Sequence, residues 1–309
     1  MKRLVITSII LFCFCAYAAF SLELELVEGV GNLSFNKDNT TALGADEAHP
    51  GTFLPVYYPL IKTGLRGDFN GVGINFGFER DPILRNNLYA NVRFEFNYFF
   101  IEGGPFLGLF NTKKLPVNPG VSAAVGLMLP GIFFAQAGGS STLAAIPMEK
   151  EGNYSRITAD LGAGFWVPHV ICSFNTSMRN YTLRDTIKNL IEDEVQRYFF
   201  RADVFSKNYG YTVKVDMGLQ VLKRSYTFLE IVGTDIVKNS ETDVFRSIYI
   251  GMEGSFSVAP GLKLLLGAEM PVYSWPGKPI LDPPKKTVFF EARAGIILTL
   301  QGKTGPQNQ

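Results

Sequence analysis

The sequence predicts an all-β fold: an antiparallel, up-and-down transmembrane β-barrel of about fourteen strands. Three observations support this prediction. Apolar residues recur at every second position, the alternating segments are long enough to cross a bilayer, and short and long connections follow one another in strict alternation. Each of these is a property that a closed membrane sheet requires.

The alternation is clearest near the end of the chain, over residues 288–300. Val288, Phe290 and Ala292 begin a series of apolar residues at every second position, and Glu291 and Arg293 lie between them. Successive side chains of a strand point to opposite faces, so this pattern gives one apolar face and one polar face. Residues 88–97, 157–165 and 211–221 repeat the pattern.

A soluble β-sandwich is the alternative, and three features favour the barrel over it. Soluble strands average about five to six residues, whereas a tilted membrane strand needs about 9 to 11. The less hydrophobic face is rich in Gly and Ser and carries charges of both signs, which a wet lumen tolerates. Aromatic pairs such as Phe99-Phe100 and Phe165-Trp166 lie near segment ends, which is typical of interfacial girdles.

The connections predict the strand count. Short turns such as Pro130-Gly131 and Pro260-Gly261 alternate with long connections, which is typical of outer-membrane hairpins with short periplasmic turns. Seven long loops give fourteen strands, with both termini periplasmic. The predicted strands are 22–35, 56–68, 72–80, 87–97, 99–111, 118–129, 132–142, 154–167, 169–181, 194–206, 209–224, 244–258, 261–273 and 286–300.

Some segments leave alternatives open. Counts of 12 or 16 strands are compatible with the pattern, because 225–237, within the long connection 225–243, could form an extra hairpin. The segment 99–111 is interrupted by Gly and Pro and could carry a bulge. Ile187, Leu190, Ile191 and Glu194 follow helical spacing after a potential cap at Thr182, so 183–195 predicts a short amphipathic helix on an outer loop.

The start of the chain predicts a secretory signal peptide. A basic beginning and an apolar stretch at 4–15 precede Ala16-Tyr17-Ala18, which fits the small-x-small cleavage rule. Cleavage is expected after Ala18, with Ser21 as the alternative. The predicted organisation is therefore a signal peptide at 1–18, a barrel at 19–300 and a periplasmic tail at 301–309.

Composition excludes several classes of protein. The formal net charge is +1 and charged residues make up 18%, so the chain lacks the basic excess typical of nucleic-acid binding. After residue 20 no apolar run reaches the length of a membrane helix. Cys172 is the one cysteine after the predicted signal peptide, so no internal disulfide is expected.

The inventory of catalytic residue types argues against an enzyme. The two histidines, His49 and His169, fall in connections on opposite sides of the predicted membrane. No His/Cys cluster with metal-ligand spacing occurs in the sequence. We therefore expect no catalytic site, metal or cofactor.

Charged residues on the inner face are the candidate site. By strand parity, Asp68, Glu79 and Lys263 point inward. The candidate lumen residues are Lys62, Arg66, Arg93, Glu95, Asp160, Arg201, Asp203, Lys214, Asp216, Glu253, Glu269, Glu291 and Arg293. These charges could create a transverse field across an open pore, or they could neutralise one another in a closed barrel.

With its signal peptide, dyad-repeat strands and final strand at 288–300, the chain resembles bacterial outer-membrane β-barrel proteins over about residues 22–300. With fourteen strands, the chain resembles the fatty-acid transporter family and small monomeric porins. Fatty-acid transporters carry an N-terminal plug, but here the first strand begins almost at the cleavage site. The residues after Leu300 also depart from the terminal aromatic residue of such proteins.

Three functions follow from this resemblance. The first is a passive channel for small hydrophilic solutes. The second is an uptake channel for hydrophobic compounds, with an apolar pocket and a wall opening at Gly103-Gly104-Pro105. The third is a surface adhesin or structural protein that acts through its long loops. The expected partners are outer-membrane lipid, the barrel-assembly machinery and small solutes, with no nucleic acid and a monomeric state.

Overall fold

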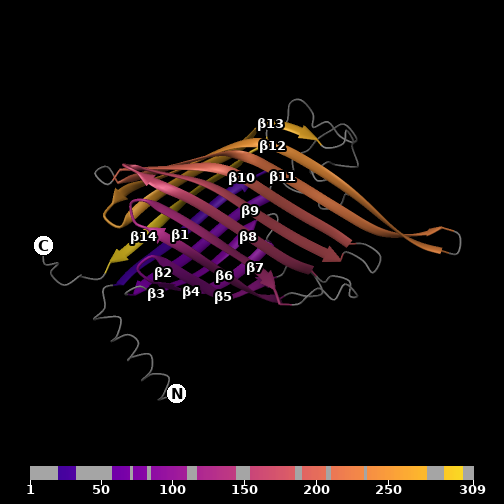
Figure 1. The fold of residues 1–309 in the computed structure, drawn as a ribbon, viewed down its shortest axis with the longest axis horizontal. Coiled ribbons are helices and arrows are strands. Elements are labelled where there is room, and N and C mark those ends of the chain that lie inside the picture. The colour runs from indigo at the N-terminus through magenta and orange to yellow at the C-terminus, as the bar shows by residue number, and fades with distance from the viewer. Residues whose placement is uncertain are drawn as a thin grey trace, which may run out of the picture.

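The computed structural model describes residues 20–32, 58–69, 72–81, 85–109, 117–143, 154–184, 190–206, 210–232, 235–276 and 289–301. In these residues fourteen strands form one closed barrel, in which each strand is antiparallel to its neighbours in sequence (Figure 1). The first and last strands close it, with Leu24 opposite Leu298. Closure leaves no open sheet edge in the barrel wall, which a strand in lipid requires. The predicted fold class is confirmed.

The strands are long, and every predicted strand overlaps one of them. Their bounds are β1 Phe20–Gly31, β2 Tyr58–Phe69, β3 Val72–Asp81, β4 Arg85–Glu95, β5 Phe99–Leu109, β6 Val117–Leu129, β7 Phe133–Thr142, β8 Tyr154–Val167, β9 Val170–Arg184, β10 Leu190–Ser206, β11 Tyr211–Val232, β12 Asp235–Ala259, β13 Leu262–Pro276 and β14 Glu291–Gln301.

Tight turns join the strands at the end of the barrel where both termini of the described chain lie (Figure 1). Gly131 and Gly261 adopt φ angles of 75° and 74° in two of these turns. Glycine reaches this left-handed region without a steric penalty from a Cβ, which explains the glycine after Pro130 and after Pro260. His169 has φ 67°, and histidine is among the few other residues that adopt such angles with some frequency.

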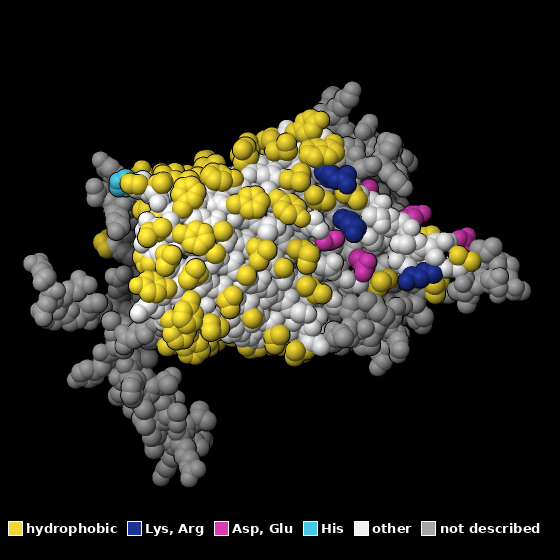
Figure 2. All heavy atoms as spheres, viewed as in Figure 1, with side chains coloured by type: hydrophobic (Ala, Val, Ile, Leu, Met, Phe, Trp, Pro, Cys, Tyr) yellow, Lys and Arg dark blue, Asp and Glu magenta, His cyan; other side chains and the backbone are white. Residues whose placement is uncertain are grey.

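An apolar belt surrounds the barrel, and it is built from the alternate residues that the sequence pattern identifies. Large side chains are exposed on it, including Phe76, Phe174, Met217 and Met252, with exposed fractions of 51–60%. Figure 2 shows hydrophobic side chains spread over one side of the barrel, with charged residues beyond them toward the protruding end. This exposed apolar surface suits contact with acyl chains.

In the described residues, no helix has the length and apolar character needed to cross a membrane.

The predicted helix at 183–195 is wrong where the structure describes it. Residues 190–195 belong to β10, and β9 continues to Arg184. Strand pairing overrides the helical spacing because Asp193 is paired with Tyr181 of β9 and Arg224 of β11. These contacts with both neighbouring strands outweigh a weak local preference.

The predicted long connection at 225–243 is also wrong. Instead of a loop or an extra hairpin, β11 and β12 extend to Val232 and from Asp235, and the extension protrudes from the barrel (Figure 1). Hydroxyl pairs lie across the extension, and Ser225 Oγ is 3.2 Å from Thr242 Oγ1. Such cross-strand pairs stabilise the pairing of β11 with β12, where β12 has no β13 partner.

The predicted irregularity in 99–111 is an interruption rather than a bulge. Pairing of β4 with β5 skips residues 90–91 and 104–105 without a change of register. Pro105 cannot donate a ladder hydrogen bond, which accounts for the gap. The register shifts lie instead between β12 and β13, at Ile248/Tyr249 and Ser257/Ala259.

Other predictions fall outside the described residues. These are the signal peptide at 1–18, the loop 36–55 with His49, the central part of the predicted helix at 185–189, and the tail after residue 301.

Candidate functional site

The inner face of the barrel carries the polar half of each alternating strand. All thirteen candidate residues lie on the face opposite the apolar belt, as their immediate neighbours show: Phe94 is exposed on the belt between Arg93 and Glu95, and Val215 lies there between Lys214 and Asp216. We call this face the lumen face.

Lumenal aromatic rings pack over lumenal glycines on the neighbouring strand. The ring of Phe106 lies over Gly120, and that of Phe100 lies over Gly126, so that a Cβ at either glycine would overlap the ring. Tyr89 covers Gly77 in the same way. The glycines of the inner face therefore make room for large side chains in the lumen.

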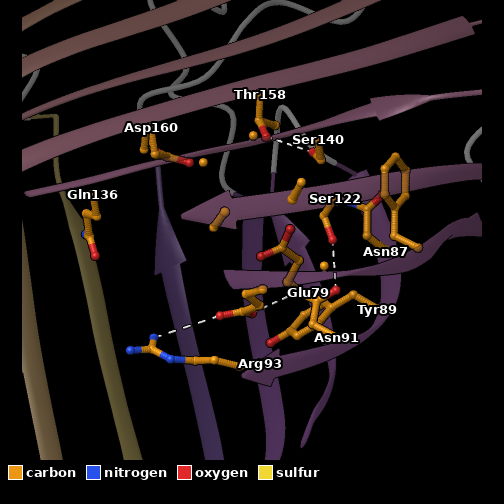
Figure 3. Close-up of a pocket in the computed structure, with 18 of the residues that line it drawn as sticks. Glu79, Asn87, Tyr89, Asn91, Arg93, Ser122, Gln136, Ser140, Thr158 and Asp160 are labelled. Carbon is orange, nitrogen blue, oxygen red and sulfur yellow. Dashed lines mark hydrogen bonds and ion pairs between the residues drawn. The ribbon is translucent and has the colours of Figure 1, made fainter. Parts of the chain in front are cut away.

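The first cavity, of about 340 Å³, lies against the sector from β3 to β9. Its polar lining includes charged groups, amides and hydroxyls from seven successive strands (Figure 3). The polar and aromatic residues that line it are Glu79, Asn87, Tyr89, Asn91, Arg93, Phe100, Glu102, Phe106, Ser122, Gln136, Ser140, Arg156, Thr158, Asp160 and Arg179.

Ion pairs join the charges of the first cavity. Arg179 Nη1 lies 2.8 Å from Asp160 Oδ1, on the adjacent strand. Arg156 Nη2 lies 3.1 Å from Glu79 Oε1, although β8 and β3 are five strands apart. This second pair therefore crosses the lumen and restricts its width.

Arg93 lies close to the carboxylates of Glu95 and Glu102 and to the ring of Phe100. Its Nε lies 2.7 Å from Glu95 Oε1, and its Nη1 lies 3.9 Å from Glu102 Oε2. Its guanidinium carbon lies 3.6 Å from the centroid of Phe100, in a cation–π arrangement. The Arg93 side chain is thereby held along the wall.

The second cavity, of about 200 Å³, lies against β2 and the sector from β10 to β14. Its charged lining comprises Lys62, Arg201, Lys214, Asp216, Glu253, Glu269 and Arg293. Both nitrogens of an Arg201 fork donate to Asp216, each at 2.7 Å. Such bidentate pairs fix the geometry of both side chains.

Glu253 joins two cations of the second cavity. Its Oε1 accepts a hydrogen bond from Lys214 Nζ at 3.0 Å, and its Oε2 lies 2.9 Å from Arg293 Nη2. Gly267 separates Glu253 from Arg293 in the sheet, and a Cβ there would lie 2.9 Å from Arg293 Nε. The missing side chain lets the arginine reach across β13.

The structure brings most of the predicted residues together, but not all. Glu95 does not line a cavity itself, but it is paired with Arg93 of the first cavity. Glu291 is paired in the same way with Arg293 of the second cavity. Arg66 and Asp203 lie on the lumen face but do not line either cavity.

The prediction missed several lumenal charges. The omitted residues are Glu25, Glu102, Arg156, Arg179, Asp193, Arg197 and Arg224. Parity could have found Arg197, which has the same parity as Arg201 in one strand, and Arg156, which has the same parity as Asp160. Asp193 was hidden by the incorrect helix.

In the two cavities charges of opposite sign are paired rather than separated. Arginines or lysines and carboxylates line both cavities, and the positive side chains are paired with nearby negative ones. This arrangement resembles the neutralised lumen more than the transverse field, since a field needs opposite signs on opposite walls.

An apolar pocket of about 520 Å³ lies over β5, β6 and β7, where belt residues such as Ile101, Val125 and Leu127 line it. The first and second cavities, on the lumen face, are both lined by charges. A Cβ on Gly104 would overlap the carbonyl oxygen of Ala90, so the backbones of β5 and β4 lie in close contact at the expected wall opening. The described part of the chain contains no group of three or more His, Cys, Asp or Glu that could hold a metal.

The comparisons with known proteins give matches of low identity to solved structures. No family model and no curated protein matches it. A porin structure matches with 10% identity and a TM-score of 0.40, covering 91% of this chain and 99% of the other. An anion-selective porin from Comamonas acidovorans has 9% identity and a TM-score of 0.41, covering 91% and 98%. A bacterial polysaccharide outer membrane secretin has 10% identity and a TM-score of 0.44, again covering 91% and 98%.

Proposed function

We propose that this protein is an outer-membrane channel of a diderm bacterium, through which small hydrophilic solutes pass passively. It functions in this proposal as a monomer, inserted by the barrel-assembly machinery, with its long loops at the cell surface. The apolar belt faces lipid, and the lumen face provides a polar route.

One observation carries the proposal: the lumenal charges keep contact with water although they are paired. Side-chain exposure is 50% for Lys62, 48% for Asp160 and 42% for Lys214. A packed protein interior would exclude water from such groups, because burying a charge is costly. Partial hydration suits a lumen that admits polar solutes.

The pairing of charges predicts weak ion selectivity. Selective pores present an excess of one sign along the path, as rings of carboxylates or of arginines do. Here each cavity contains both signs, so neither anions nor cations gain a strong electrostatic advantage.

The test is conductance of the refolded full-length protein in planar bilayers. We expect stepwise currents, with a reversal potential near zero in a potassium chloride gradient. Absence of steps from protein that is shown to be folded by its heat-modifiable mobility on gels would refute the channel function. A strongly shifted reversal potential would refute the selectivity argument alone.

The protruding β11–β12 ribbon favours one second candidate, a surface-binding role. Residues 228–232 pair only with 235–239 among the described strands, and Leu229 and Val237 are exposed on this ribbon. Such a ribbon leaves strand edges for a partner. Removing its tip would abolish a surface function but leave conductance unchanged.

A further inference from the structure

The first cavity has a balanced set of charges. It contains the guanidinium groups of Arg93, Arg156 and Arg179 and three carboxylates. Arg156 is paired with Glu79 and Arg179 with Asp160, while Arg93 lies 3.9 Å from Glu102. The charges of this cavity therefore have counter-charges within the protein.

The polar groups left unengaged in the same cavity are neutral. The amide of Gln136 is exposed on the lumen face and has no hydrogen-bond partner in the part of the chain that the structure describes. The hydroxyl of Tyr89 likewise has no hydrogen-bond partner among the described residues. An amide offers both donors and an acceptor, and a phenol offers one donor and an acceptor.

Other neutral groups are held in place by their neighbours (Figure 3). Ser122 donates to Asn91 Oδ1 at 2.8 Å, and Asn91 in turn donates to Glu102 at 3.2 Å. Ser140 and Thr158 are joined by a 2.7 Å hydrogen bond. The wall of the cavity thus presents fixed donors and acceptors rather than mobile side chains, which lowers the entropic cost of binding.

We propose that the first cavity is a binding site for a neutral, polyhydroxylated solute of the size of a monosaccharide or disaccharide. This inference rests on the proposed channel function, because the solute reaches the site through the lumen. The volume of about 340 Å³ falls within the range of about 300–1,000 Å³ typical of small-molecule sites. Sugar hydroxyls both donate and accept, so they complement a wall of amides, hydroxyls and paired charges.

The same pairing disfavours a charged solute. An anionic solute would have to displace Glu79 or Asp160 from its arginine. A cationic solute would have to displace Arg156 or Arg179 from its carboxylate. This competition is strongest at Arg156, whose side chain is 7% exposed, because a buried group that loses its partner costs free energy. The second cavity differs, because its lining contains four cations and three carboxylates.

The experiment measures binding of glucose and maltose to the refolded full-length protein in detergent by isothermal titration calorimetry. Gluconate and glucosamine serve as charged comparisons. Tyr89→Phe and Gln136→Ala remove the two unengaged neutral groups and leave every ion pair intact. Ser255→Ala is the matched control, since it removes a hydroxyl from the lumen face of β12 outside both cavities.

We expect saturable binding of at least one neutral sugar, weakened about two- to tenfold by each cavity variant and unchanged by Ser255→Ala. No saturable binding of either neutral sugar, tighter binding of a charged analogue, or equal binding by all variants would overturn the proposal. Conductance of the same preparations separates the two claims. Sugar binding without conductance would refute the channel and leave the site standing, and conductance without sugar binding would do the reverse.

Discussion

The buried ion pair between Asp193 of β10 and Arg224 of β11 provides a quantitative test of the fold. Arg224 Nε and Nη2 contact the two carboxylate oxygens of Asp193 at 2.5 and 2.7 Å, and their side chains are 3% and 5% exposed. Arg224→Met leaves a carboxylate buried without its counter-charge. Breaking a buried pair on one side costs about 3–5 kcal/mol, so we expect a loss of that size in the free energy of unfolding.

The matched control lies one residue away in both strands. Lys223 and Glu194 form a pair at 3.6 Å on the opposite face, where the lysine side chain is 45% exposed. Lys223→Met should cost below about 1 kcal/mol, because exposed pairs contribute little. The double variant Asp193→Leu/Arg224→Met removes both buried charges and should be more stable than Arg224→Met.

The assay is urea unfolding of the protein in lipid vesicles, followed by the fluorescence of its two tryptophans. Equal losses for Arg224→Met and Lys223→Met would refute the reasoning, because the two pairs would then have the same environment. A double variant as unstable as the sum of its two single variants would show that Asp193 and Arg224 do not interact.

Further predictions concern the belt, the lumen and the packing. Leu161→Arg, on the apolar belt, should cost about 2–4 kcal/mol in vesicle unfolding, whereas Gln136→Arg, on the lumen face, should cost much less; the reverse order would contradict the assigned faces. Arg156→Ala removes the ion pair that crosses the lumen, so single-channel conductance should rise, and an unchanged or smaller conductance would show that this pair does not restrict the path. Gly126→Ala places a methyl group against the ring of Phe100 and should cost about 1–3 kcal/mol by urea unfolding; no loss would mean that the ring moves freely.

Sequence reasoning predicted the strands because period-two alternation is a local property that the barrel imposes on every segment. It could assign faces for the same reason, as with Leu161 outside and Asp160 inside. It failed at 183–195 and 225–243, where polar residues lie beyond the apolar belt and no longer need to alternate in hydrophobicity. There the partner strands, and not the local pattern, determine the conformation.

The candidate site was only partly predictable for a different reason. Parity identifies which charges face the lumen, but it does not show which of them meet. The pair of Arg156 with Glu79 joins strands five positions apart, and Arg293 reaches Glu253 across Gly267. These contacts depend on barrel curvature and on which side chains are absent, so they emerge only in three dimensions.

The central claim is that alternate residues of each strand face lipid and water. Nitroxide labels placed singly at residues 156–165 of β8, in a Cys172→Ser background, would test it by electron paramagnetic resonance in vesicles. We expect collision with oxygen to peak at odd positions and collision with a water-soluble nickel complex to peak at even positions, each with a period of two. Oxygen and nickel accessibility that rise and fall together, or odd positions shielded from both reagents, would contradict a lipid-facing belt around a hydrated lumen.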